Sequence, residues 1–180
     1  MTEASDGELL GRVLAGEREL FACLVDRYTD RLGRYATRML GNQADAEDAL
    51  QDTFVRAYRS LANCKPEGFG PWVFGILVNR CRTYGARRAR ANGVIVTSEL
   101  AMAHASVPHS EARDALRDAI NWALIQLPAD QREAFLLKHV EDLSYDTMAE
   151  VTGVRAAALR MRVFRARDEL RKLLAEEVRD

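Results

Sequence analysis

The sequence predicts an all-α protein built from two small helical domains joined by a flexible linker. Apolar residues recur at spacings of three and four along most of the chain, which is the pattern of amphipathic helices. The only strand-like run, Val94-Ile95-Val96, is too short to build a sheet. Small and polar residues around Pro108 interrupt the helical pattern, which places the domains at 1–90 and 113–180 and the linker at 91–112.

The formal net charge of −1 conceals an uneven distribution of charge along the chain. Residues 68–98 contain five arginines and no acid, and residues 152–180 contain 8 bases and 5 acids. Between them, residues 99–151 contain 10 acids and 4 bases, while residues 1–67 contain 12 acids and 9 bases. The two basic zones are therefore candidate sites for a polyanion such as nucleic acid.

Composition and spacing argue against several other classes of protein. No apolar run approaches the roughly 18 residues of a membrane span, and the acidic N-terminus is unlike a signal peptide. Cys23 and Cys81 are expected to be buried and Cys64 to lie in a loop; their wide spacing predicts neither zinc nor disulfides and favours the cytoplasm. His104 and His109 lie in the linker without a ligand cluster. Without a nucleophile–base pair or a phosphate-binding loop, no catalytic residue, metal or cofactor is predicted.

Two helices are predicted before the most informative stretch of the chain. The first begins near Ser5 or Asp6 and ends near Gly16. The second runs from 18 to 40 and ends at Gly41-Asn42. Its apolar stripe consists of Leu20, Phe21, Leu24, Val25, Tyr28, Leu32, Tyr35, Ala36, Met39 and Leu40.

A third helix, over residues 45–59, carries a concentration of acids. Asn42 is the expected N-cap, and Arg56 and Arg59 occupy the last turn, which suits the helix dipole. The apolar stripe is Ala46, Leu50, Phe54, Ala57 and Leu61, and a different face carries Asp45, Glu47, Asp48, Gln51 and Asp52. Taken alone, this pattern is typical of an amphipathic helix whose acidic face is merely solvated.

Residues 62–71 are predicted to form a loop because they contain two prolines and two glycines. The next helix begins at Trp72, and Trp72, Ile76 and Cys81 are expected to face inward. The later part of this helix and the residues after it carry Arg80, Arg82, Arg87, Arg88 and Arg90. Arginines on a helix preceded by aromatic residues and a loop suit melted or single-stranded nucleic acid, and a solvated basic helix end is the alternative.

The second half is predicted to contain helices at 111–126, 130–140, 145–151 and 155–177. Ser144 is the expected cap of the third of these helices, and Gly153 forms the turn into the last. A short helix, a turn and a basic helix form a helix-turn-helix pattern, whose second helix fits the major groove of DNA. An arginine-rich surface helix is the alternative.

Several of these stretches resemble one known family. The run D-A-E-D-A-L-Q-D-T-F-V-R-A-Y at 45–58 resembles the segment of bacterial sigma-70 factors, in sigma domain 2, that docks on core RNA polymerase. The spacing of Phe69, Trp72, Ile76 and Asn79 resembles the part of the same domain that reads the −10 element. The run L-P-x-x-x-R-E-A-F-L-L at 127–137 and the arginine pattern of 160–174 resemble sigma domain 4, which reads the −35 element and holds the polymerase flap tip.

The resemblance implies three sets of contact residues. The clamp helices of core RNA polymerase would contact Asp45, Glu47, Asp48, Gln51 and Asp52. Melted −10 DNA would contact Asn63, Lys65, Phe69, Asn79, Arg80, Thr83 and Arg87, with one flipped base held by the loop from 63 to 69. Duplex −35 DNA would contact Arg155, Arg160, Met161, Arg162, Phe164 and Arg165.

The chain departs from the family pattern in two places. Thr83 stands where many members have Asp, which bears on the −10 preference. Arg155, Ala158 and Met161 stand where many members have Ser, Thr and Ser at the start of the recognition helix. The lost side-chain cap is worth about 1 kcal/mol. The loss of small polar contacts predicts an unusual −35 preference or a greater reliance on salt-sensitive phosphate contacts.

The length and domain order resemble group 4, or extracytoplasmic-function (ECF), sigma factors, which contain only domains 2 and 4. The leading hypothesis is therefore a cytoplasmic, non-enzymatic sigma factor that binds core RNA polymerase and promoter DNA and makes no membrane contact of its own. The family resemblance also implies control by an anti-sigma protein. A stand-alone helix-turn-helix regulator would leave the helix at 45–59 and the arginines of 80–90 without a role. An adaptor that docks protein partners is the third possibility.

Overall fold

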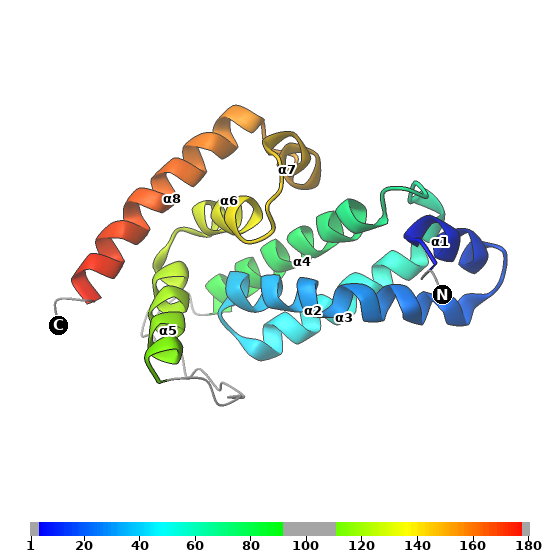
Figure 1. The fold of residues 1–180 in the computed structure, drawn as a ribbon, viewed down its shortest axis with the longest axis horizontal. Coiled ribbons are helices and arrows are strands. Elements are labelled where there is room, and N and C mark those ends of the chain that lie inside the picture. Colours follow the sequence, from blue (N-terminus) through cyan, green and yellow to red (C-terminus); the bar gives the residue numbers. More distant parts are fainter. Residues whose placement is uncertain (1–3, 92–110, 178–180) are drawn as a thin grey trace.

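The computed structural model describes residues 4–91 and 111–177, and within these ranges it contains eight α-helices and no strand. Figure 1 shows α2, α3 and α4 side by side as a long bundle with α1 at one end. The helices α6, α7 and α8 lie over the other part of this bundle, with α5 beside them. The all-α fold class is therefore confirmed. No helix among the described residues is long and apolar enough to cross a membrane.

The first helix, α1 (Asp6–Leu14), begins with a capping box. The Ser5 hydroxyl oxygen accepts a hydrogen bond from the Glu8 amide, and the Glu8 carboxylate accepts one from the Ser5 amide at 2.7 Å. The Asp6 carboxylate also accepts hydrogen bonds from Arg27 and Tyr28 of the second helix. These contacts fix α1 against the end of the bundle.

The second helix begins more tightly wound than its sequence predicts. The 3-10 turn η1 (Arg18–Leu20) precedes α2 (Phe21–Leu40), where a single helix from residue 18 was expected. Gly41 ends α2 in the left-handed conformation, with φ 64°. Leu24, Leu32 and Tyr35 from the predicted stripe are fully buried, so the inner face of α2 is confirmed.

The helix α3 (Gln43–Arg59) carries the acidic stretch and is capped as expected. The Asn42 side-chain oxygen accepts a hydrogen bond from the Asp45 amide at 2.9 Å. The buried line along α3 is Ala46, Ala49, Thr53 and Ala57. The predicted stripe is therefore correct at its ends and wrong in its middle, where Leu50 and Phe54 lie at the edge of the core. Small residues at the buried positions allow the neighbouring helices to approach closely.

The loop after α3 contains the short turn η2 (Leu61–Asn63), and α4 (Phe69–Ala91) begins at its end. The helix therefore starts three residues before Trp72. Its buried residues are Phe69, Val73, Phe74, Leu77, Val78 and Cys81. Trp72 and Ile76, which were predicted to face inward, are only half-buried. A Cβ atom at Gly70 would lie 2.8 Å from the Tyr28 hydroxyl oxygen, so glycine allows α4 to start against α2.

The predictions for the cysteines are only partly correct. Cys81 is buried as expected, and burial raises the pKa of its thiol to about 12. Cys23 is exposed because α2 turns the neighbouring Leu24 into the core instead. Cys64 is buried although it lies in the predicted loop, and burial raises the pKa of its thiol as well.

The C-terminal helices are α5 (Glu111–Gln126), α6 (Ala129–His139), α7 (Tyr145–Thr152) and α8 (Ala156–Glu177), close to the predicted bounds. Ser144 caps α7 by accepting a hydrogen bond from the Thr147 amide at 3.1 Å. Gly153, with φ 71°, makes the turn into α8. The helix α8 packs on α5, α6 and α7, and it buries Leu159, Val163, Ala166 and Leu170. The helix-turn-helix is therefore confirmed.

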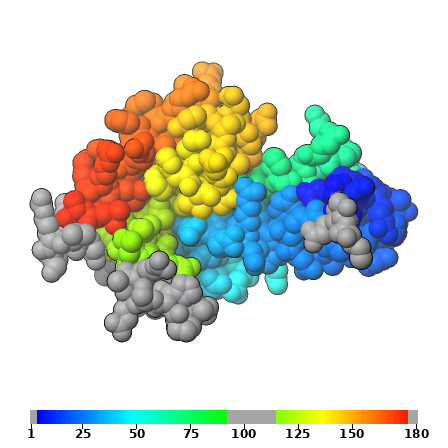
Figure 2. All heavy atoms as spheres, in the orientation of Figure 1, coloured from blue at the N-terminus to red at the C-terminus, as the bar shows by residue number. Residues whose placement is uncertain are grey.

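The two halves of the chain pack directly on each other. The helix α7 lies against α4, and α5 and α6 lie against α2. Figure 2 shows the yellow and orange atoms of α6 to α8 seated on the blue and green atoms of the bundle. Apart from residues 91, 111 and 112, the predicted linker lies outside the described residues, as do its strand-like run and its two histidines.

Candidate functional site

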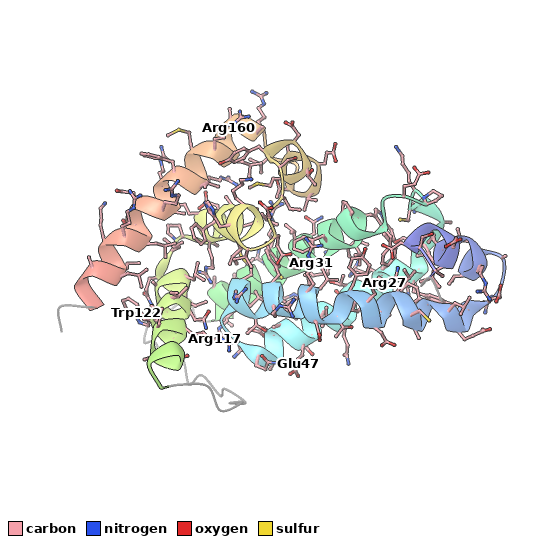
Figure 3. All side chains as sticks on the ribbon, in the orientation of Figure 1. Arg27, Arg31, Glu47, Arg117, Trp122 and Arg160 are labelled. Carbon is pink, nitrogen blue, oxygen red and sulfur yellow. The ribbon has the colours of Figure 1, made fainter. Side chains whose placement is uncertain are left out.

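The acidic face of α3 has an outer row and an inner row. Glu47, Asp48 and Gln51 are exposed, and neither of the two acids forms an ion pair with a described residue. Figure 3 shows Glu47 on the side of α3 that faces away from α6, α7 and α8. Asp45 and Asp52 form the inner row and are half-buried. Despite these acids, no group of three or more metal-ligating side chains in the described residues is arranged to hold a metal ion.

The inner row of α3 is paired with arginines of α4. Asp52 Oδ2 lies 3.4 Å from Arg80 Nη1, and Asp45 Oδ2 lies 3.1 Å from Arg88 Nη1. Partial burial alone would raise the pKa of Asp52, but hydrogen bonds and positive charge from Arg56 and Arg80 lower it below its ordinary value. The α3 carboxylates therefore neutralise part of the basic face of α4.

Four of the predicted −10 contacts are open to solvent. Asn63 and Lys65 are exposed on the loop before α4, which projects beside α1 in Figure 2. Asn79 and Arg87 are exposed on α4. The guanidinium carbon of Arg87 lies 5.7 Å from the centroid of the Tyr84 ring, which orients this arginine along the helix.

The other three predicted −10 contacts are less accessible. Arg80 is half-buried because of its pairing with Asp52. Thr83 is half-buried, and its hydroxyl donates to the Asn79 carbonyl at 2.9 Å. Phe69 is 1% exposed and packs edge-on against the Tyr28 ring, with the centroids 5.3 Å apart. In this conformation Phe69 anchors the start of α4, and its ring is not presented to a DNA base.

The predicted −35 contacts lie mainly on the outer face of α8. Five of them are exposed: Arg155, Arg160, Met161, Phe164 and Arg165. Phe164 is 68% exposed, an unusual value for an aromatic residue. Arg162 differs because it is half-buried and pairs with Asp130 of α6 at 3.2 Å. Figure 3 places Arg160 near the start of α8, on the side of the molecule away from α2 and α3.

Near the start of α8, two cationic side chains lie close to one aromatic ring. The Arg160 guanidinium carbon lies 5.0 Å from the centroid of Tyr145, and Lys138 Nζ lies 5.5 Å from it. The helix α8 begins at Ala156, directly after Arg155. An arginine side chain has no acceptor atom, so it cannot provide the N-cap hydrogen bond that Ser144 provides for α7.

Arg82 joins the two halves, a role that the sequence interpretation did not assign. This arginine of α4 donates to both carboxylate oxygens of Glu133 on α6 at 2.7 Å. It also donates to the Thr152 carbonyl of α7 at 3.1 Å. Glu133 is only 3% exposed, so the bidentate ion pair satisfies a charge that would otherwise be buried alone.

Two further arginines cross the interface between the halves. Arg31 of α2, which Figure 3 shows between the halves, donates to the Glu141 carboxylate at 2.6 Å. Arg132 of α6 donates to the Met39 carbonyl of α2 at 2.7 Å. Burial lowers the pKa of Arg132. We call Arg31, Arg82, Arg132, Glu133 and Glu141 the interface cluster.

One sequence signal pointed to this cluster. Glu133 precedes Leu136 and Leu137 by three and four residues, which places it on the apolar face of α6. An acid on a buried face requires a cationic or hydrogen-bonding partner. The spacing does not indicate which of the many arginines is that partner.

Comparison with protein families identifies both halves. The family Sigma-70 region 2 matches residues 24–91, which contain most of α2 together with α3 and α4. The family Sigma-70, region 4 matches residues 117–170, which extend from within α5 into α8.

Relatives with similar sequences are sigma factors. The RNA polymerase sigma-H factor of Pseudomonas aeruginosa is 30% identical, over 100% of this chain and 99% of its own length. The RNA polymerase sigma factor CarQ of Myxococcus xanthus is 33% identical, over 89% of this chain and 92% of CarQ. The ECF RNA polymerase sigma factor SigE of Mycolicibacterium smegmatis is 35% identical over 85% of this chain, and the match spans 61% of that longer relative.

Two solved structures have the same fold. CnrH, in complex with the cytosolic domain of CnrY, has a TM-score of 0.71 and 28% identity, over 96% of this chain and 99% of its own. The sigma factor RpoE of Bartonella quintana, in complex with the anti-sigma factor NepR, has a TM-score of 0.69 and 28% identity, over 86% and 96%. Because the family matches cover both halves, a relative matches over 99% of its own length, and several relatives are ECF sigma factors, this chain belongs to the extracytoplasmic-function group of the sigma-70 family of RNA polymerase sigma factors.

Proposed function

We propose that this sigma factor directs promoter-specific initiation through three separate contact surfaces. The observation that carries the proposal is the exposure of opposite charges on two sides of the molecule, acids on α3 and arginines on α8. Core polymerase and promoter DNA can therefore be bound at the same time. In this division, residues 1–90 bind polymerase and the −10 element, residues 91–112 form the linker, and residues 113–180 bind the −35 element.

Core polymerase binds the acidic surface of α3. Glu47, Asp48 and Gln51 present exposed oxygen atoms, and Asp45 and Asp52 stand behind them. Such a surface complements the basic clamp helices that the sigma-70 resemblance implies as its partner. The C-terminal half adds a second contact, to the flap tip.

Promoter DNA binds two basic surfaces. Asn63 and Lys65 on the loop, with Asn79 and Arg87 on α4, are accessible to the phosphates and unstacked bases of melted −10 DNA. Opening then results from binding energy gained on a flipped base that paired DNA does not offer. On α8, the exposed arginines reach phosphates and guanine edges of the duplex −35 element, and Met161 and Phe164 suit thymine methyl groups.

An anti-sigma protein holds the chain inactive in the cytoplasm. The complexes of CnrH with CnrY and of RpoE with NepR contain chains whose fold matches both halves of this one. We therefore assign the packed arrangement of the halves, held by the interface cluster, to the inactive state. A stand-alone helix-turn-helix regulator is not favoured, because relatives match the polymerase-binding half as well.

Run-off transcription with purified core polymerase and a library of random promoters tests the proposal. The chain should support initiation from a subset of templates, and Asp48→Lys should weaken both core binding and transcription because it reverses an exposed charge on α3. Asp30→Lys, at an exposed acid of α2, is the matched control and should leave both unchanged. A chain that binds duplex DNA unaided but supports no initiation from the library would contradict the proposal.

A further inference from the structure

The ion pairs between α3 and α4 connect two surfaces that bind different partners. We propose that Asp45 and Asp52 mask Arg88 and Arg80 in the free chain, and that polymerase binding to α3 releases these arginines to the −10 strand. This inference rests on the proposed function, in which α3 binds polymerase and α4 binds melted DNA. It makes the two aspartates positioning residues for DNA recognition as well as polymerase contacts.

Each of the two carboxylates contacts an α4 arginine on one side and is open to solvent, where polymerase would bind, on the other. Asp45 and Asp52 each have one side turned to α4, with ion-pair distances of 3.1 Å to Arg88 and 3.4 Å to Arg80. Both aspartate side chains nevertheless remain 31% exposed, so a basic group of a partner can reach them from outside. Asp52 also accepts a hydrogen bond from Arg56 at 3.1 Å, so its charge is already shared between two arginines.

These pairs are weak enough to exchange. An ion pair between partly exposed side chains changes an equilibrium by only about two- to five-fold, because water competes for both partners. The buried, bidentate pair between Arg82 and Glu133 contrasts with them, because Glu133 is 3% exposed and cannot be reached without opening the interface. A polymerase cation can therefore replace Arg80 or Arg88 at a carboxylate at little cost.

Exchange of this kind couples the two binding events. Once polymerase binds its carboxylate partner, an α4 arginine is no longer paired within the chain, and its positive charge is free to approach a phosphate. By linkage, DNA bound to these arginines strengthens polymerase binding to α3 by the same factor. The free chain then binds single-stranded DNA less tightly than the holoenzyme does, although both carry the same arginines.

Asp48 provides a matched control on the same helix. It lies three residues after Asp45 and four before Asp52, and it is exposed without an ion pair to any described residue. Asp48→Asn removes the same charge from the same region and exposes no arginine. It therefore measures the general effect of lowering the negative charge near DNA.

The experiment measures binding of the full chain to fluorescein-labelled oligothymidine at low salt, and separately to core polymerase. Asp45→Asn and Asp52→Asn should each raise the affinity of the free chain for the oligonucleotide about three-fold, and the double variant about ten-fold. Asp48→Asn should change this affinity less than about two-fold. In the holoenzyme the double variant and the unmodified chain should bind the oligonucleotide equally, because polymerase has already released both arginines.

A second substitution separates masking from simple charge removal. Arg80→Ala should have little effect on oligonucleotide binding by the free chain, but in the Asp52→Asn background it should abolish the gain. A gain that survives Arg80→Ala, or one that Asp48→Asn matches, would overturn the inference. If core affinity is unchanged by all three aspartate substitutions, the proposed polymerase surface fails instead, whatever the oligonucleotide shows.

Discussion

The helices α4 and α8 are both rich in arginine, but their arginines are in different electrostatic states. On α4, Arg80, Arg82 and Arg88 each have a carboxylate of this chain within 3.4 Å. On α8, Arg160 and Arg165 are exposed and have no carboxylate partner among the described residues. The difference arises from the neighbours, because the α4 arginines meet acids of α3 and α6, whereas Arg160 and Arg165 of α8 meet no acid among the described residues. An arginine-rich helix can therefore hold a fold closed or present charge to DNA.

Removal of Arg82 should have the largest effect on this comparison. Arg82→Ala leaves the Glu133 carboxylate buried without a cation, and breaking a buried pair from one side costs about 3–5 kcal/mol. The chain can relieve this cost by parting α4 from α6 and α7. We therefore expect a lower unfolding temperature together with a larger radius of gyration in small-angle X-ray scattering.

Arg87→Ala is the control for this prediction, because Arg87 is exposed on the same helix, lies over the Tyr84 ring and pairs with no carboxylate among the described residues. It should leave both measurements unchanged. Equal behaviour of the two variants would show that the ion pair with Glu133 does not hold the halves together.

Two arginines of α8 should differ in their contribution to promoter binding. Arg165→Ala should weaken holoenzyme binding to a duplex −35 element by about 1–3 kcal/mol, as expected for an arginine that contacts DNA. Arg162→Ala should weaken it less, because Arg162 is half-buried and paired with Asp130. Filter binding at fixed salt measures both. A larger loss for Arg162→Ala would mean that the paired arginine is the reader.

The uncapped start of α8 can be repaired by one substitution. Arg155→Ser supplies the acceptor oxygen that the helix start lacks, and a serine N-cap is worth about 1 kcal/mol of folding stability. The same change removes a cation, so the dependence of DNA affinity on salt should fall by about one phosphate contact. Urea unfolding and salt titration measure the two effects. Arg155→Ala, which removes the cation without adding an acceptor, should reproduce only the second.

The smallest predicted effect is on the pKa of His139, at the end of α6, which lies near the positive charge of Arg167 on α8. Partial burial lowers the pKa of His139 below its usual value of about 6.5, and the charges of Arg167 and Lys138 lower it further. The folded chain therefore favours the neutral ring. Folding stability is fully present above about pH 6.5 and falls as the pH drops below it, because the unfolded chain takes up the proton first.

Nuclear magnetic resonance titration should report this lowered pKa directly. Arg167→Gln should raise the pKa of His139 toward its usual value, whereas Arg90→Gln on α4 should not change it. A pKa above the usual value in the unmodified chain would show that the neighbouring arginine does not reach the ring.

The element boundaries were largely predictable because they depend on local chemistry. Asn42 and Ser144 accept hydrogen bonds from amides three residues ahead, and Gly41 and Gly153 tolerate a left-handed backbone. Each of these features can be inferred from a few neighbouring residues. The exposure of Glu47, Asp48 and Gln51 on α3 follows from the same local spacing, because they lie on a different face from the buried residues of that helix.

The errors concern which way a helix is rotated and what a charged side chain meets. The buried line of α3 passes through Ala49 and Thr53, which are small and carry little hydrophobic signal. The larger Leu50 was therefore assigned to the core, although it is only half-buried. Phe69 resembled a loop residue because it lies between two glycines, but α4 had already begun there. The partner of Arg82 lies 51 residues away, and no local pattern specifies such a pairing.

The salt dependence of duplex DNA binding by the free chain tests most directly whether α4 arginines are neutralised and α8 arginines are free. Each released phosphate counterion contributes about 0.9 to the slope of log affinity against log salt. The account predicts that Arg160→Ala combined with Arg165→Ala lowers this slope by about two, while Arg80→Ala combined with Arg88→Ala leaves it unchanged. Equal reductions in slope for the two double variants would contradict it.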